Sequence, residues 1–97
     1  MKTGNISRQE LKEYAESIDG AILETRARHH RFLFHVDDKG FYYTPSSTMK
    51  QRVQDNKYID LVLQGFNNRR SLIPSDYHDL TMNASYLLTV IEKYMNA

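Results

Sequence analysis

The sequence has 97 residues, which suits a single domain spanning residues 1–97. It has no cysteine, so disulfides, thiolate metal ligands and thiol nucleophiles are excluded. Thirteen Lys and Arg against twelve Asp and Glu give a net charge of +1, a small excess for a dedicated nucleic-acid binder. No apolar run approaches the roughly 20 residues of a membrane span, and the N-terminus lacks a signal-peptide core. We therefore expect a cytoplasmic protein without a membrane partner.

The first predicted element is a helix over residues 8–18. Ser7 and Glu10 have the spacing of a capping box, in which a hydroxyl and a carboxylate satisfy two backbone amides at a helix start. Gly20 follows the segment and suits a helix C-terminus. The apolar positions of this segment recur at the spacing of one helix face, at Leu11, Tyr14, Ala15 and Ile18.

A β region follows, with strands predicted at residues 21–25, 31–36 and 41–44. Residues 37–40 form a hairpin turn in which Gly40 suits positive φ, and Pro45 ends the last strand because it cannot donate to a ladder.

Alternation along the hairpin predicts its register and its buried face. If Val36 lies opposite Phe41, then Phe34 lies opposite Tyr43 and His35 lies opposite Tyr42. The aromatic-rich face is assigned to the core and consists of Phe32, Phe34, Val36, Phe41 and Tyr43. The other face carries Arg31, Leu33, His35, Tyr42 and Thr44.

The second half of the chain is predicted to be helical. Hydroxyl residues 46–48 precede a short helix over residues 49–53, and longer helices are expected over residues 57–67 and 82–95. The fold class is therefore α+β with the order α-β-β-β-α-α, in which helices pack on one face of a three-stranded antiparallel sheet.

A basic cluster in the hairpin is the first candidate for partner binding. It contains Arg26, Arg28, His30 and Arg31, with His35 further along the strand and Tyr42 across the ladder. Guanidinium groups donate two hydrogen bonds to phosphate or carboxylate, and an exposed tyrosine can stack on a base. A nucleic acid, an acidic protein surface, and a solvated face whose arginines pair with local carboxylates such as Glu24 all fit this cluster.

The second candidate is the turn after Pro45, where Lys50 and Arg52 fall in the first turn of the short predicted helix. An anion held on the free amides of a helix start would suit two cations there. The alternative is a capped strand-to-helix turn without a ligand.

No pattern in the sequence indicates a metal, a cofactor or catalysis. His29 and His30 are adjacent, so on a strand they point to opposite faces, and neither H-E-x-x-H nor G-x-S-x-G occurs. We therefore expect no metal, no cofactor and no enzymatic activity.

Over residues 8–66 the predicted element order is similar to that of the double-stranded-RNA-binding domain. That resemblance implies contacts across RNA minor grooves through a basic cluster at the start of the helix after the sheet. Here that position offers Lys50 and Arg52, or Lys57, and the family's Lys-Lys-x-Ala-Lys run does not occur.

The sequence thus predicts a small non-enzymatic binding module that contacts a nucleic acid or an acidic protein surface through its basic hairpin. Accessory proteins of phages and other mobile elements provide the expected context. The alternative is a protein-interaction domain that forms a homodimer or larger assembly through its open sheet edge or the face carrying Leu33 and Tyr42.

Overall fold

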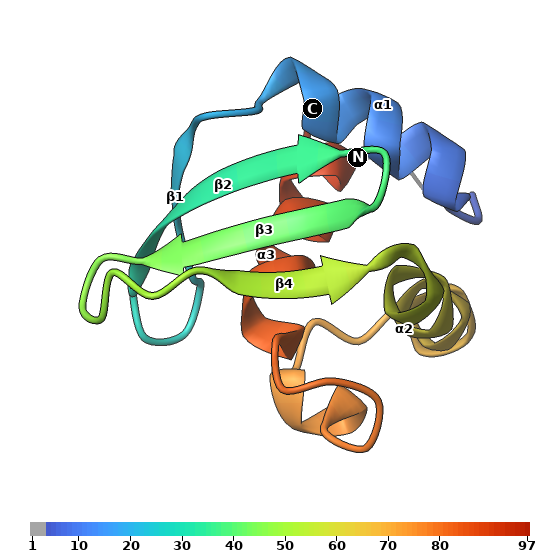
Figure 1. Cartoon of the computed structure of the whole chain (residues 1–97). Coiled ribbons are helices and arrows are strands. Elements are labelled where there is room, and N and C mark those ends of the chain that lie inside the picture. The colour runs from blue at the N-terminus through green and yellow to red at the C-terminus, as the bar shows by residue number, and fades with distance from the viewer. Residues whose placement is uncertain (1–3) are drawn as a thin grey trace.

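An antiparallel sheet of four strands forms one layer of the computed structural model, which describes residues 4–97, and α-helices form the other layer (Figure 1). The fold is α+β, with helices on one face of the sheet. In chain order the elements are α1 (Arg8–Ser17), β1 (Ile22–Glu24), β2 (Arg31–Asp37), β3 (Gly40–Pro45), β4 (Arg52–Asp55), α2 (Asn56–Arg69), the 3₁₀ helix η1 (Pro74–Tyr77) and α3 (Ala84–Met95).

The predicted first helix and hairpin are confirmed. Ser7 and Glu10 form both bonds of the capping box at the start of α1. Strands β2 and β3 pair Phe34 with Tyr43, and the neighbouring pairs follow the predicted register. The four aromatic side chains of the predicted core face, Phe32, Phe34, Phe41 and Tyr43, are completely buried.

The prediction of three strands is wrong, because β4 lies where a short helix over residues 49–53 was expected. It pairs with β3 and places Tyr42 opposite Val53. The hydroxyl of Thr48 accepts a bond from the amide of Lys50 at 3.3 Å, and Met49 has a φ of 56°, so this segment turns instead of starting a helix. The two longer helices expected downstream are confirmed as α2 and α3.

The fourth strand also changes the element order to α-β-β-β-β-α-α. Residues 8–66 therefore do not have the order α-β-β-β-α in which the sequence resembles the double-stranded-RNA-binding domain.

A chain of polar contacts that begins at the buried Tyr43 and Gln54 fixes β4 against the segment before α3. The Tyr43 hydroxyl donates to Gln54 Oε1 at 2.7 Å, and the Gln54 amide donates to Thr81 Oγ1 at 3.2 Å. Asn83 then accepts from Arg52 Nε at 2.8 Å and donates to the carbonyl of Val53 at 3.2 Å. These bonds explain why Gln54, only 2% exposed, is tolerated inside the sheet's core face.

Gly40 is required by the close approach of β3 and β4. A Cβ at this position would lie 2.1 Å from the carbonyl oxygen of Gln54 and 2.9 Å from Cα of Asp55. Only a residue without a side chain therefore allows the two strands to pair at this end.

None of the helices within residues 4–97 combines the length and the apolar character that crossing a membrane requires.

Candidate functional site

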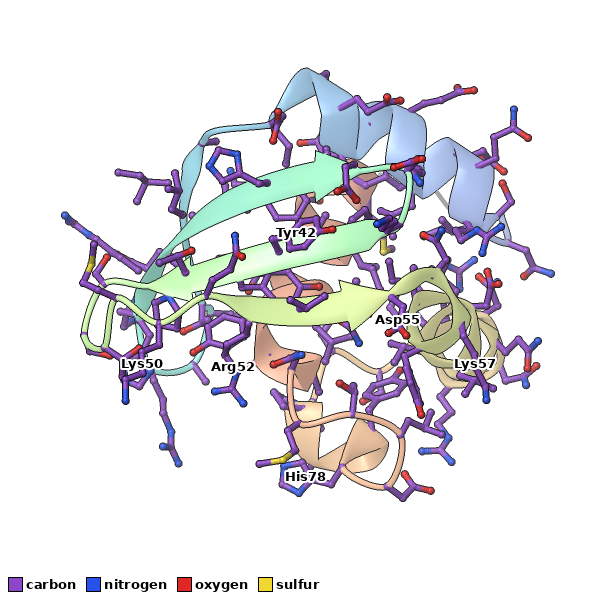
Figure 2. All side chains as sticks on the ribbon, viewed as in Figure 1. Tyr42, Lys50, Arg52, Asp55, Lys57 and His78 are labelled. Carbon is purple, nitrogen blue, oxygen red and sulfur yellow. The ribbon has the colours of Figure 1, made fainter. Side chains whose placement is uncertain are left out.

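The arginines of the strands lie at one end of the sheet and the aspartates of the strands at the other, with Glu24 at the first end and Lys39 at the second. Because consecutive strands are antiparallel neighbours, the β1–β2 and β3–β4 loops lie at the same end. This basic end carries Arg26, Arg28, Arg31, Lys50 and Arg52. The opposite, acidic end carries Asp37 and Asp38 at the β2–β3 turn and Asp55 as the last residue of β4. Figure 2 shows Lys50 and Arg52 at one end of β4 and Asp55 at the other.

A cleft of about 460 Å³ opens beside the basic end. Its walls come from the β1–β2 loop, the segment around η1, and α3. The basic residues that line it are Arg26, Arg28, His30 and His78, and we call this cleft the basic cleft. Apolar lining comes from Leu72, Ile73, Pro74 and Leu88, and hydroxyl groups come from Thr25, Ser75, Ser85 and Thr89.

Local hydrogen bonds hold the β1–β2 loop in shape. The amide of His30 donates to Thr25 Oγ1 at 3.0 Å, and the amide of His29 donates to the Thr25 carbonyl at 3.0 Å. His29 itself takes a φ of 56°, which histidine tolerates better than most residues. Its ring lies 2.9 Å from a carboxylate oxygen of Glu24, and this bond, with a further one from Arg31, lowers the pKa of Glu24.

Of the four basic side chains that line the basic cleft, one forms an ion pair and three do not. Arg26 forms an ion pair with Glu92 of α3 at 3.1 Å, which fastens the loop to the helix. The side chains of Arg28, His30 and His78 make no hydrogen bond or ion pair with any residue in the range 4–97. These three groups are therefore available to an anion from outside.

His35 and Tyr42 lie away from the basic cleft, on the face of the sheet that no helix covers. The His35 ring is 3.0 Å from Asp19 Oδ1, and the Tyr42 hydroxyl donates to Asp37 Oδ2 at 2.7 Å. The bond from His35 lowers the pKa of Asp19, and the bond from Tyr42 lowers the pKa of Asp37. The same contact with Asp37 raises the pKa of Tyr42. Carboxylates thus border both side chains, which disfavours a polyanion across this face.

The remaining predicted residues have separate places. Arg31 lies 3.5 Å from Glu24 and is largely exposed, and Lys50 is exposed on the β3–β4 loop. Arg52 is half-buried, and its guanidinium lies 5.7 Å from the ring centroid of Tyr86, so it has a structural role at the edge of the core. Because no helix begins at Met49, the amides that the second candidate site required are not those of a helix.

The structure thus divides the predicted set and adds residues that the sequence analysis missed. Arg26, Arg28 and His30 share one cleft with His78, Ser75 and Ile73, which are more than forty positions further along the chain. Figure 2 shows His78 near η1, away from the sheet face that carries Tyr42. Pro74 and Ser75 begin η1, and nothing in their local sequence indicates which loop lies beside it.

Among residues 4–97, no group of three or more His, Asp or Glu side chains could hold a metal ion.

The sequence matches no family model, and comparisons with curated proteins and with solved structures give no match either.

Proposed function

We propose that this domain is a non-enzymatic binding module that holds an acidic segment of a partner protein in its basic cleft. One observation carries the proposal: Arg28, His30 and His78 line the same cleft, and none of their side chains is paired within the described chain. An unpaired guanidinium and two unpaired imidazoles on one concave surface favour an anionic ligand, because charge-assisted hydrogen bonds to carboxylates are among the strongest available.

The chemistry of the cleft walls favours a protein segment over a nucleic acid. The cleft also has apolar lining from Leu72, Ile73 and Leu88, and no Phe, Tyr or Trp is among its described lining residues. Proteins that bind single strands rely on aromatic rings for base stacking. The exposed tyrosine that the sequence offered for stacking, Tyr42, is bonded to Asp37 on another surface. A net charge of +1 also provides little of the long-range attraction that nucleic-acid binding requires.

The ligand that fits both walls is a short peptide segment with alternating acidic and apolar side chains. Its apolar side chains would contact Leu72 and Leu88, while its carboxylates would accept from Arg28 and, when protonated, from the two imidazoles. Burial of an apolar anchor beside a rim of charges is a common arrangement in protein recognition.

A titration followed by backbone amide chemical shifts tests this proposal. The probe is an eight-residue peptide that alternates Glu and Leu, compared with a peptide that alternates Gln and Leu and with a short oligothymidylate. We expect the Glu-Leu peptide to perturb amides in residues 25–31 and 72–78. Arg28→Ala should weaken that binding by roughly tenfold, as expected for loss of a charged hydrogen bond.

Lys39→Ala is the matched control, because Lys39 is an exposed cation on the turn at the acidic end. It should leave the affinity unchanged. Perturbations outside the two segments, equal binding of the Gln-Leu peptide, or no perturbation at millimolar peptide would overturn the proposal. Tighter binding of the oligothymidylate in the same segments would overturn the choice of a protein partner and favour a nucleic acid.

A further inference from the structure

The four histidines of the chain fall into two classes by their surroundings. His29 and His35 each lie beside a carboxylate of the chain itself, at 2.9 Å and 3.0 Å. His30 and His78 have no such partner among residues 4–97, and both line the basic cleft. The two imidazoles that lack an internal carboxylate are therefore the two that face the proposed ligand.

Hydrogen bonds and burial fix the backbone that carries these two imidazoles. The amide of His30 donates to Thr25 Oγ1 at 3.0 Å, which holds this residue on the β1–β2 loop. His78 directly follows η1 (Figure 2). There the buried Tyr77 donates its hydroxyl to the Ser71 carbonyl at 2.8 Å. The two imidazoles thus lie on different walls of one cleft, on backbone that the fold holds in place.

The other charged groups of the cleft are two cations and one carboxylate. The β1–β2 loop contributes Arg26 and Arg28, and α3 contributes Glu92, whose carboxylate already pairs with Arg26 at 3.1 Å. Charged or titratable groups of the neighbouring segments that do not line the cleft are Glu24, His29, Arg31, Asp76, Asp79 and Lys93. Among the described lining residues, every carboxylate is therefore paired, and a carboxylate for the imidazoles must come from a ligand.

The two unpaired imidazoles make the charge of the basic cleft depend on pH. Histidine is the side chain whose charge ordinarily changes between pH 5 and 8, so acidification across this range adds up to two positive charges to the cleft. A protonated imidazole donates a charge-assisted hydrogen bond to a carboxylate, and the carboxylate in turn favours the protonated imidazole. Binding of an acidic ligand and binding of protons therefore strengthen each other.

We infer that the basic cleft is a proton-dependent site, which binds its acidic ligand more tightly as His30 and His78 become protonated. This inference rests on the proposed function. Arg28 keeps its charge at every pH used here and supplies the affinity that remains at alkaline pH. An exposed ion pair strengthens binding by about threefold, so the two imidazoles together should strengthen it by roughly tenfold.

Titration of the Glu-Leu peptide at pH 8.0 and at pH 5.5, followed by backbone amide chemical shifts, tests this inference. Both ends of the peptide are blocked, and its glutamates have an ordinary pKa of about 4.3, so the peptide stays ionised over this range. We expect the dissociation constant at pH 5.5 to be roughly one tenth of that at pH 8.0. The blocked Gln-Leu peptide, which has no carboxylate, should show no such change.

Substitutions assign the effect to the two histidines. His30→Gln and His78→Gln should each reduce the change in affinity between the two pH values to about threefold, and the double variant should show no change. His35→Gln is the matched control, because His35 is bonded to Asp19 outside the cleft, and it should keep the tenfold change. Calorimetric titration at pH 6.5 in two buffers of different ionisation enthalpy should show that the unmodified chain takes up protons on binding and that the double variant does not.

Each negative result has a distinct meaning. Equal affinity at the two pH values would overturn this inference and leave the proposed function standing. A change with pH that persists in the double variant, or that the Gln-Leu peptide shows equally, would overturn the role of the imidazoles. No binding at either pH would overturn the proposed function and this inference with it. Circular dichroism of each variant at both pH values establishes that the fold is intact.

Discussion

Replacement of Gly40 by alanine should destabilise the sheet strongly. The new Cβ would lie 2.1 Å from the Gln54 carbonyl oxygen, whereas ordinary contacts begin at 3.4 Å. The added Cβ therefore overpacks the site. Strand β4 must move away by more than about 1 Å, and this movement weakens the pairing at this end. Overpacking costs about 1–3 kcal/mol, and a stretched backbone hydrogen bond adds about 1 kcal/mol. We expect a loss of about 2–4 kcal/mol in the free energy of unfolding.

Urea unfolding and thermal melting followed by circular dichroism measure this loss. In a domain of this size, each kcal/mol lowers the melting temperature by about 4–8 °C, so Gly40→Ala should lower it by roughly 8–32 °C. Gly20→Ala is the matched control, because Gly20 has a φ of 84° but no atom within 4 Å of the added Cβ. Gly20→Ala should lower the free energy of unfolding only by the roughly 1–2 kcal/mol that a left-handed backbone conformation costs an alanine. If Gly40→Ala is no more destabilising than Gly20→Ala, the steric argument is wrong.

Tyr43→Phe should lower the free energy of unfolding by about 1–3 kcal/mol, because it leaves the buried Gln54 oxygen without its donor. Urea unfolding should show a far smaller loss for Tyr58→Phe, because Tyr58 lies on the surface. Ser7→Ala should lower the free energy of unfolding by about 1 kcal/mol in the same assay, because the capping box is lost. Acid should also destabilise the fold. The pKa of Asp37 lies below its ordinary value of 3.8, so its stabilisation is complete above that pH and is lost as pH falls through the folded pKa.

Equal stability of Ser7→Ala and of Ser47→Ala, a loop serine, would mean that the capping box contributes nothing. For acid, we compare urea unfolding of the unmodified chain and of Asp37→Asn between pH 7 and pH 3. The advantage of the unmodified chain over the variant should be constant above pH 3.8 and should shrink as the pH falls from 3.8 to 3, and a constant difference over the whole range would contradict the assigned cause.

Local patterns predicted the hairpin because its information is contained within a few residues. The alternation of Phe32, Phe34 and Val36 predicts the register that β2 and β3 have, and Ser7 with Glu10 predicts the start of α1. Strand β4 was missed because Thr48 and its neighbours resemble helix caps. Its four residues became a strand through pairing with β3 and through the bond from Tyr43 to Gln54, and both depend on tertiary contacts.

The basic cleft could be predicted only in part for the same reason. Arg26, Arg28 and His30 are close in sequence and were recognised as a cluster. His78 and Ile73 join them only because α2 carries the chain away from the sheet and the segment after it returns beside α3. No local pattern indicates that the Tyr42 hydroxyl donates to Asp37, or that the Arg52 guanidinium lies over the Tyr86 ring, because both contacts depend on the tertiary structure.

The strand order has a consequence for how this chain folds. Every strand pairs with its neighbour in sequence, so the sheet can assemble from successive hairpins without closing a long loop. The packing of α1 on α3 is different, because the bond from Tyr94 to Glu10 joins residues 84 positions apart. We therefore expect the sheet to form before the two end helices dock. Substitutions at Tyr94 should then accelerate unfolding and leave the refolding rate nearly unchanged in stopped-flow measurements.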